Sequence, residues 1–435
     1  MRLLAVVLVA ACTSENVVVG NLQEVTSLKA IPNHELDVLF VVDNSPSMLD
    51  KQESLAANFP RMIDVLATLD DGVPDLHIGV VTSDLGTSGS QTAPAPGIGS
   101  GPGQCRGTGD AGNLQQTAAM TERYLADGNY SGALRDAFAQ LAQVGDQGCG
   151  FEQHLGAMRR ALDNNTTNAG FLRDAANLAV VILADEDDCS VADSAFFGPD
   201  TATLGPLQSF RCFRFGVQCD PDDNAPGDKT NCRPRANSYL DDVSPYADFL
   251  VGLKSDARRV MVAGVVGDPA PVAVELAPPP GGGPAIPTLA HSCTFAGLNG
   301  PEVADPSVRI ASFLDHFPGR SRLTSICNDD LSSAVSDIGE SAKQLMGDPC
   351  LDTSQLADTS DAPGIQPACE VADVRDAAPT SPTAIPSCAD SAGTCYELAA
   401  DPIACPATPD HLRVQIHRTG DVTADTWTHV RCQPR

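Results

Sequence analysis

Asp43, Ser45 and Ser47 are the residues of this 435-residue chain whose types and spacing most clearly suggest chemistry. The string Asp43-Asn44-Ser45-Pro46-Ser47 offers one carboxylate and two hydroxyl groups within five residues. Hard divalent cations such as Mg²⁺ and Ca²⁺ take oxygen ligands of this kind. Short polar strings also arise by chance, and the alternative is that Ser45 or Ser47 caps the helix that follows.

The residues on either side of this string predict a strand, a loop and a helix. Leu36 to Val42 is an almost continuous apolar run, which is typical of a strand buried on both faces. After the string, apolar residues recur at helical spacing: Met48, Leu55, Phe59, Met62, Ile63, Leu66 and Leu69. The string therefore closes a buried strand and precedes an amphipathic helix.

The rest of the first 346 residues predicts an α/β fold. Three further apolar runs are expected strands: Leu76 to Thr82, Asn177 to Ala184 and Val260 to Val266. Helical patterns lie at Ser131 to Val144, Glu152 to Asn164, Pro245 to Ser255, Pro306 to His316 and Asp329 to Met346. This alternation predicts a doubly wound, mostly parallel sheet with helices on both faces. Such sheets bind ligands beyond the carboxyl ends of their strands, where Asp43 and Asp185 both fall.

Residues 35–346 resemble a von Willebrand factor A domain, in the order strand, D-x-S-x-S, helix, then a later strand and Asp. In that family the first-motif Asp and two Ser, a Thr on a second loop and an Asp in a T-D-G-like turn surround a cation. Asp43, Ser45 and Ser47 match, and Ala184-Asp185-Glu186 stands where T-D-G would. The resemblance implies a Mg²⁺ or Ca²⁺ site whose open coordination position accepts a carboxylate from a protein ligand.

The second loop departs from the family pattern. Its G-x-T should fall near Gly148-Cys149-Gly150-Phe151-Glu152, and no Thr is present there. Glu152 is the candidate replacement ligand, and the alternative is that Cys149 only braces the loop through a disulfide. The acidic run Asp185 to Asp188 could add negative potential near the metal, with Asp187 as a minor candidate, although charge runs are more often solvated loops.

Composition narrows the classes of function. The formal net charge of -29 argues against nucleic acid and against anionic membrane surfaces as partners. G-x-S-x-G, H-E-x-x-H and P-loop strings are absent, and none of the eight His is spaced as a metal ligand. His77 and His154 are interpreted as structural residues. We therefore expect a binding protein rather than an enzyme.

The beginning of the chain predicts export. Residues 1–12 are one basic residue and an apolar run, and Val9-Ala10-Ala11-Cys12 resembles a bacterial lipobox, which implies cleavage before Cys12 and its acylation. No later stretch reaches the ~20 apolar residues that span a bilayer. We expect membrane attachment by this lipid anchor only, residues 13–34 as a tether, and a place in the bacterial cell envelope facing the periplasm or the exterior.

The cysteines support export and a domain boundary near Gly347. Fifteen cysteines less Cys12 leave 14, which fits seven disulfides of undetermined connectivity. Eight precede the boundary (Cys105, Cys149, Cys189, Cys212, Cys219, Cys232, Cys293 and Cys327), and six follow it (Cys350, Cys369, Cys388, Cys395, Cys405 and Cys432). We expect residues 35–347 to form the α/β domain and residues 348–435 a small Cys-rich β domain.

Two predictions concern segments outside the alternation of strands and helices. Gly/Pro-rich segments at residues 86–112, 198–237 and 268–301 are expected to be long surface loops, pinned in part by disulfides. Near the end of the chain, Leu412 to Ile416 and Thr428 to Cys432 suggest a terminal β pairing, with Trp427 in the core of the small domain.

Three functions remain open from sequence. The first is an exported, lipid-anchored surface protein that binds a divalent cation and mediates protein–protein interaction or adhesion. The second is a metal-independent structural scaffold of the envelope, in which the motif is only a helix cap. The third, with the least support, is a secreted hydrolase.

Overall fold

The computed structural model describes residues 22–435, apart from 32, 70–71, 89–96, 100–102, 280–281, 298–299, 329, 348–349, 361–363 and 406–407. The predicted signal, Cys12 and residues 13–21 of the predicted tether lie outside the described residues. Among the helices that are described, none is long and apolar enough to cross a membrane.

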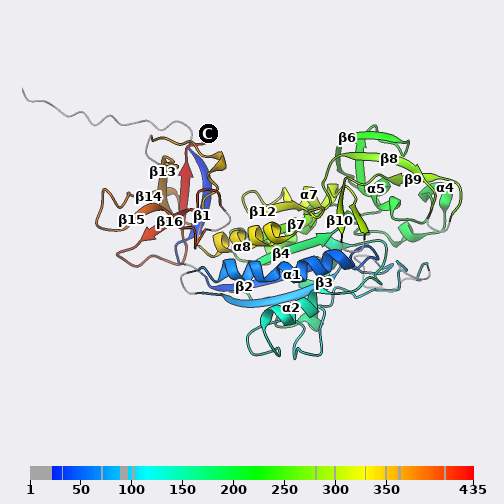
Figure 1. Ribbon diagram of the computed structural model, residues 1–435, viewed down its shortest axis with the longest axis horizontal. Helices are drawn as coiled ribbons and strands as arrows, with labels where there is room; N and C mark the ends of the chain where they lie inside the picture. Colours follow the sequence, from blue (N-terminus) through cyan, green and yellow to red (C-terminus); the bar gives the residue numbers. More distant parts are fainter. Residues whose placement is uncertain are drawn as a thin grey trace, which may run out of the picture.

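A five-stranded parallel sheet forms the centre of the molecule and confirms the predicted α/β fold (Figure 1). Its order is β12-β7-β4-β2-β3, and every neighbouring pair is parallel. The strands are β2 (Glu35–Val42), β3 (Asp75–Thr82), β4 (Asn177–Ala184), β7 (Val260–Val266) and β12 (Ser321–Ser325). Sequence patterns missed only β12, because this edge strand is partly exposed and carries no apolar run.

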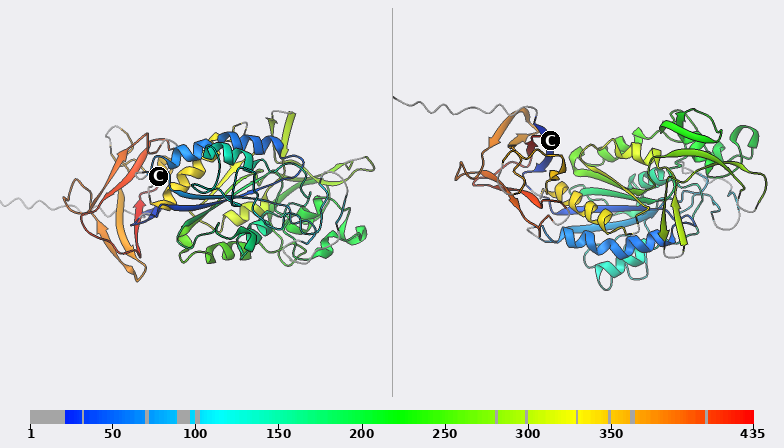
Figure 2. Two further views of the ribbon diagram at one scale, coloured as in Figure 1. Left: turned by 90° about the horizontal axis from the view of Figure 1, so that it is seen from below. Right: turned by 45° about the horizontal axis from the view of Figure 1, so that its top comes forward.

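Helices cover both faces of this sheet (Figure 2). They are α1 (Leu49–Leu66), α2 (Leu134–Ala142), α3 (His154–Leu162), α6 (Ser244–Gly252), α7 (Val308–Leu314) and α8 (Ser332–Met346). Alternate residues of a strand point to opposite faces. Accordingly, Val38 and Phe40 of β2 pack with α1, α2 and α8, whereas Leu39 and Val41 pack with α3, α6 and α7.

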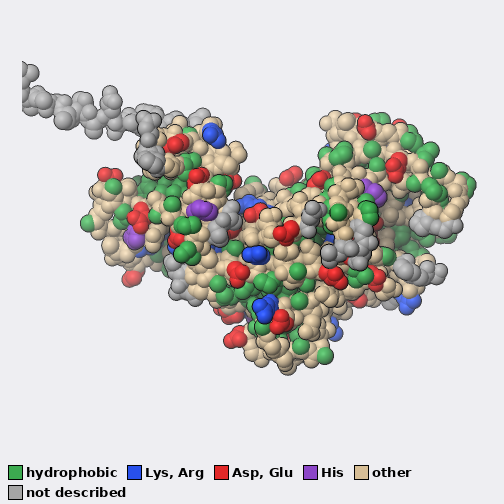
Figure 3. Space-filling view, viewed as in Figure 1, with side chains coloured by type: hydrophobic (Ala, Val, Ile, Leu, Met, Phe, Trp, Pro, Cys, Tyr) green, Lys and Arg blue, Asp and Glu red, His purple; other side chains and the backbone are tan. Residues whose placement is uncertain are grey.

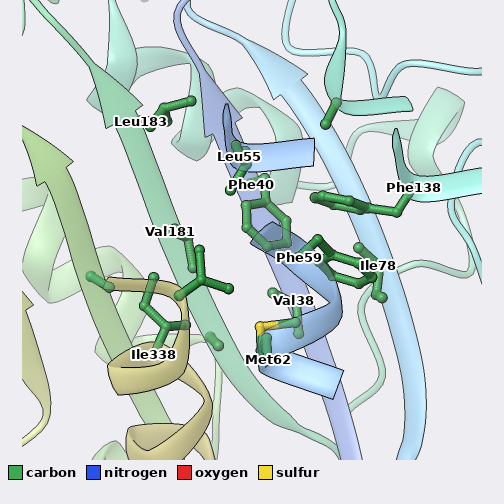
Figure 4. Packing of buried hydrophobic residues seen from close by; sticks show 14 of the residues in the cluster. Val38, Phe40, Leu55, Phe59, Met62, Ile78, Phe138, Val181, Leu183 and Ile338 are labelled. Atoms are coloured by element: carbon green, nitrogen blue, oxygen red, sulfur yellow. The ribbon is translucent and has the colours of Figure 1, made fainter. Parts of the chain in front are cut away.

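Aromatic packing holds α1 and α2 on the sheet (Figure 4). The rings of Phe59 on α1 and Phe138 on α2 stack with centroids 3.7 Å apart, and Phe40 of β2 lies 4.9 Å from Phe138. All three side chains are at most 2% exposed. This cluster fixes the helix that follows the D-x-S-x-S string against the strand that precedes it.

The segments predicted to be long surface loops instead build a second lobe, so that prediction is wrong for residues 198–237 and 268–301. The lobe contains α4 (Thr201–Leu204), α5 (Phe210–Gly216) and an antiparallel sheet of β5 (Val217–Asp220), β6 (Gly227–Pro234), β8 (Val272–Ala277) and β9 (Ile286–Leu289). A hairpin of β10 (Cys293–Gly297) and β11 (Gly300–Ala304) follows. The small core includes Phe213, Val217 and Val272.

The C-terminal unit is a β structure that also takes in residues from the start of the chain. Its sheet has the order β1-β17-β13-β14, with β1 (Gln23–Lys29), β13 (Cys369–Arg375), β14 (Ala378–Ile385) and β17 (Thr426–Cys432). Residues 23–29, which we expected in a tether, therefore form an edge strand paired with β17. A separate hairpin joins β15 (Cys395–Ala400) to β16 (Leu412–His417), so the predicted pairing between the two last strands is wrong.

Short 3₁₀ helices complete the fold: η1 (Thr166–Asn168), η2 (Ser194–Phe197), η3 (Ala257–Arg259) and η4 (Thr353–Gln355). The helix α8 ends at Met346 and is capped by Gly347, whose φ of 103° is left-handed, and the elements beyond it are mainly strands. Trp427 is 2% exposed, as expected of a core residue, but the guanidinium of Arg258 lies 3.5 Å from its ring centroid. Trp427 therefore packs at the junction of the two units.

All 14 cysteines outside the signal are paired, as the parity of their number predicts. The bridges are Cys105–Cys149, Cys189–Cys212, Cys219–Cys232, Cys293–Cys327, Cys350–Cys405, Cys369–Cys432 and Cys388–Cys395. Four lie in the α/β part and three in the C-terminal unit, and none of the seven joins the two.

The two ends of the central sheet face different surroundings. The C-terminal unit packs beside η3, which leads into β7, and the strands point away from it toward the second lobe (Figure 1). On the face shown in Figure 3, a hollow separates the C-terminal unit from this lobe. The carboxyl ends of β2 and β4, and with them the predicted site, therefore lie at the end opposite the C-terminal unit.

Candidate metal site

The loop after β2 turns Asp43 and the two serines into one cluster of oxygen atoms. The Oδ1 of Asp43 accepts a hydrogen bond from the backbone N–H of Ser45 at 2.7 Å. The hydroxyl oxygens of Ser45 and Ser47 are 3.2 Å apart. Neither serine caps the next helix, because the N-cap of α1 is Met48 and no side chain accepts a hydrogen bond there. The helix-cap interpretation thus has no support in the geometry.

Asp185 reaches the same place from the neighbouring strand. Because β2 and β4 are paired in register, Val42 opposite Leu183, their carboxyl ends coincide. Asp43 is fully buried and Asp185 is 3% exposed. Burial and the charge of Asp43 raise the pKa of Asp185 to about 6, against the lowering effects of Lys51 and the Ser47 side chain. The structure therefore brings together all four predicted ligands of the first motif and the T-D-G-like turn.

Two carboxylate oxygens in this cluster lack hydrogen-bond partners. They are the Oδ2 of Asp43 and the Oδ1 of Asp185, both fully shielded from solvent. The nearest cationic atom to the Oδ2 of Asp43 is the Nε2 of His154, at 3.5 Å. Buried carboxylate oxygens are costly unless they are paired or coordinate a metal.

The donor set fits a hard cation. Two carboxylates and two hydroxyls are ligands that Mg²⁺ and Ca²⁺ accept, with water completing the shell. In the part of the chain that the structure describes, no three His, Cys, Asp or Glu side chains converge as a metal cluster. A cation here would depend on the serine hydroxyls as well as on Asp43 and Asp185.

Glu152 lies within reach of this cluster, just before α3. It is 1% exposed and its Oε1 has no hydrogen-bond partner. Burial, followed by the charges of Glu186 and Asp43, raises its pKa well above the ordinary range, and its side chain also hydrogen-bonds with that of Glu186. Glu152 therefore lies in a buried acidic cluster with Glu186 and Asp43, and its ligand role stays a prediction.

A disulfide of Cys149 braces the second loop, as the alternative interpretation of this residue predicts. Cys149 is bonded to Cys105, and both are at most 1% exposed. The neighbouring Gly148 donates its backbone N–H to the carbonyl of Asn44 at 2.8 Å, which ties the second loop to the first. A Cβ on Gly148 would lie 2.1 Å from the Oδ1 of Asn44, so this close approach requires glycine.

Asp187 has a structural task, which corrects its role as a minor candidate at the site. Its carboxylate accepts hydrogen bonds from the backbone N–H groups of Arg309 and Ile310 at 2.8 and 3.1 Å, at the start of α7. Asp188 pairs with the Arg309 guanidinium at 3.0 Å, and both side chains are fully buried. The second half of the acidic run, Asp187 and Asp188, therefore anchors α7 and is not a solvated loop.

Two residues near the site were not identified as functional from sequence. His154, interpreted as structural, opens α3 and faces Asp43; burial lowers its pKa, but Asp43, Asp188 and Asp187 raise it above the usual value overall. Lys51, in the first turn of α1, places its Nζ 3.0 Å from the Oδ2 of Asp185. Its spacing of four residues from Ser47 is visible in sequence, but its carboxylate partners are remote in the chain.

A cavity of about 360 Å³ opens beside Lys51. Its walls come from the first half of α1, from Phe295 to Gly297 of the β10–β11 hairpin, and from Ile326, Asn328 and Leu331 ahead of α8. None of the predicted metal ligands lines this cavity, and Lys51 is the residue that it shares with the surroundings of the site.

Comparison with known proteins gives distant structural likenesses. No family model matches the chain, and no curated protein matches it either. It is similar to a von Willebrand factor type A structure from Catenulispora acidiphila, with 11% identity over 95% of this chain and 66% of that one, at a TM-score of 0.29.

Two pilus adhesins are also similar. SpaC from Lactobacillus rhamnosus GG is 10% identical over 94% of this chain and 40% of its own, at a TM-score of 0.32. RrgA from Streptococcus pneumoniae is 12% identical over 95% of this chain and 58% of its own, at a TM-score of 0.24. This chain therefore spans about half the length of these adhesins.

Proposed function

We propose that this chain is an exported binding protein that holds one divalent cation, Mg²⁺ or Ca²⁺, and uses it to bind a protein ligand. Asp43, Ser45, Ser47 and Asp185 would hold the cation, with Glu152 as a further candidate. A bound cation that keeps water ligands supplies an exchangeable position for a carboxylate of the partner. The proposal includes no catalytic step.

The observation that carries this proposal is a pair of buried carboxylate oxygens that accept no hydrogen bond, Asp43 Oδ2 and Asp185 Oδ1, at the ends of adjacent parallel strands; the first has His154 Nε2 3.5 Å away. A core that only supported the fold would gain by pairing or replacing these groups, since an unsatisfied buried carboxylate destabilises it. Two serine hydroxyls 3.2 Å apart lie in the same loop and supply neutral oxygen ligands.

The location and the anchor belong to the same proposal. Seven disulfides fit an oxidising compartment outside the cytoplasm. Acylation of Cys12 would attach the protein to the bacterial envelope. With a net charge of -29, an acidic partner would be repelled unless a cation bridged the two proteins.

A metal-independent scaffold is the second candidate, and one observation favours it. The ammonium of Lys51 already neutralises one oxygen of Asp185 without any metal, 3.0 Å away. On this account the acidic end of the sheet is a structural ion-pair network. Catalysis by a secreted hydrolase has no comparable observation in its favour.

Thermal unfolding of the mature chain in Mg²⁺, in Ca²⁺ and in excess chelator separates the two candidates. A cation that binds only the native state stabilises it by about 2.7 kcal/mol at 100 times its dissociation constant. We expect this shift in the wild type and in Asp163→Asn, an exposed control, and its loss in Asp43→Asn. A wild type that melts alike in all three solutions would favour the scaffold.

Capture from envelope extract tests the second half of the proposal. We expect wild-type protein to retain a partner in Mg²⁺ or Ca²⁺ and to release it in chelator, and we expect Asp43→Asn to retain none. A partner that stays bound to both proteins in chelator would contradict cation-mediated binding.

A further inference from the structure

Lys51 is a buried cation at the edge of the candidate metal site. Its side chain is 1% exposed, and its Nζ lies 3.0 Å from the Oδ2 of Asp185 and 2.9 Å from the carbonyl oxygen of Ser47. Both of those residues belong to the proposed metal site. The ammonium thus lies next to the position that a divalent cation bound to Asp185 would take.

The β10–β11 hairpin holds Lys51 from the other side. The Oε2 of Glu302 is 2.5 Å from Nζ, and the ring centroid of Phe295 is 5.7 Å from it. Phe295 and Glu302 are directly opposite each other in the hairpin, so their side chains lie on one face. This cross-strand pair binds the ammonium, although its residues lie about 250 positions further along the chain.

The hairpin is itself fixed to the main domain. Its first residue, Cys293, is bonded to Cys327, which follows β12 and precedes α8. The carboxylate of Glu302 therefore belongs to an anchored element. A substitution of Glu302 should change the charge next to Lys51 without releasing the hairpin.

Electrostatics makes the ammonium and a divalent cation rivals. Both are attracted to Asp185, and like charges a few ångströms apart repel strongly inside a protein. Glu302 offers the ammonium a second carboxylate, which draws it away from the site. The charge on Asp185 is thus shared between an internal cation and an external one.

We propose that Lys51 is an internal counter-ion that competes with the divalent cation for Asp185, and that Glu302 sets the strength of this competition by holding the ammonium on the hairpin. The inference rests on the proposed cation site and adds its regulation. Without metal, Lys51 stabilises the buried Asp185; with metal bound, the ammonium is held by Glu302. The affinity of the site is therefore set partly from the hairpin.

Titration calorimetry with Mg²⁺ tests the competition. We expect Lys51→Met to bind Mg²⁺ about 10-fold or more tightly than the wild type, because one repulsive charge is removed. Arg61→Met is the matched control, an exposed cation on the same helix, and it should leave the affinity unchanged. This inference would be overturned if the wild type binds Mg²⁺ and Lys51→Met binds it no more tightly. That result would leave the proposed function intact. Absence of binding in both would overturn both.

A double-mutant cycle tests the part played by Glu302. Glu302→Gln should weaken Mg²⁺ binding several-fold when Lys51 is present, because Asp185 is then the only carboxylate that pairs with the ammonium. The same substitution should have little effect in the Lys51→Met background, since coupling between contacting residues disappears with one partner. Equal weakening in both backgrounds would show that Glu302 acts on the metal directly. It would overturn the proposed role of Glu302 as the ion-pair partner that holds Lys51.

Melting in chelator tests the counter-ion role without any metal. Lys51→Met should melt below the wild type in chelator, because Asp185 loses its buried partner. Saturating Mg²⁺ should close most of this gap, whereas Arg61→Met should show no gap in either solution. A Lys51→Met variant that melts with the wild type in chelator would contradict the counter-ion role.

Discussion

Asp43 donates its backbone N–H to the carbonyl oxygen of Leu183, 3.0 Å away, at the point where β2 and β4 end. This bond continues the parallel ladder by one step beyond the last paired strand residues. It places Asp43 beside the strand end that carries Asp185. Backbone pairing therefore sets the separation of the two carboxylates, and their side chains can be changed without moving the strands.

Ser47→Ala separates a metal ligand from a helix cap. Because the N-cap of α1 is Met48 and has no side-chain partner, the variant loses no cap, and in chelator it should lose only about 1 kcal/mol from the hydrogen bond between the Ser47 side chain and Asp185. Its Mg²⁺ affinity should fall about 10-fold, with Ser54→Ala on α1 as the unchanged control. Urea unfolding in chelator and calorimetry give the two quantities. A Mg²⁺ affinity equal to that of the wild type would contradict the ligand role of Ser47.

Asp84 should make the stability of the metal-free protein fall as the pH rises. Burial raises its pKa to about 6 from the ordinary 3.8, with Asp110 adding to the rise. The folded state therefore holds a proton that the unfolded state has lost, so this stabilisation is complete below about pH 4 and is lost as the pH passes 6. Asp84→Asn, which keeps an acceptor for the N–H of Gly86, should flatten this part of the profile by on the order of 1 kcal/mol.

Urea unfolding in chelator at half-unit steps from about pH 4 to about 7 measures the profile. Asp163→Asn, an exposed carboxylate elsewhere, should keep the wild-type slope between pH 4 and 6. An Asp84→Asn variant with that same slope would contradict the assignment to Asp84.

The Cys105–Cys149 bridge should matter more for stability than the Cys388–Cys395 bridge. They close segments of 44 and 7 residues. The loss of loop entropy in the unfolded chain predicts about 4 kcal/mol for the first and about 2 kcal/mol for the second. Paired Cys→Ser variants compared by urea unfolding test this order, and the first pair should also weaken the response to Mg²⁺. Equal losses would show that loop length does not control these bridges.

Removing Asp188 should strongly destabilise the protein, because Arg309 would stay buried without its partner. Asp188 also accepts hydrogen bonds from the backbone N–H of Leu155 and from the Ser190 hydroxyl, at 2.9 and 2.6 Å. We expect Asp188→Ala to lose about 3–5 kcal/mol in urea unfolding. The combined variant with Arg309→Met should lose less than Asp188→Ala alone. A larger loss in the combined variant would contradict the ion pair as the cause.

Sequence patterns predicted the elements whose burial is uniform. β2 and β4 are shielded on both faces, so they carry apolar runs, interrupted in β2 only by Asp37, and Asp43 and Asp185 stand out where those runs end. β12 is a partly exposed edge strand and carries no such run. The strand Gly227–Pro234 of the second lobe consists mostly of polar, glycine and proline residues, so its pairing depends on tertiary contacts and on the Cys219–Cys232 bridge.

The candidate site also has residues that sequence patterns predict and residues that only the tertiary fold brings together. Its proposed ligands follow from a local string and from the ends of two predicted strands, both of which are visible in sequence. Lys51 and Glu302 meet only because the hairpin folds back over α1, 251 residues further along the chain. Asp187 looked like part of a solvated acidic run because its partner, the start of α7, is equally remote.

Calorimetric titration of Mg²⁺ and of Ca²⁺ into chelator-stripped mature protein measures whether Asp43 and Asp185 hold a divalent cation. We expect the wild type to bind one equivalent of at least one of the two cations, and neither Asp43→Asn nor Asp185→Asn to bind any, with all three proteins folded. A wild type that binds neither cation, or an Asp43→Asn variant that binds as the wild type does, would contradict this expectation.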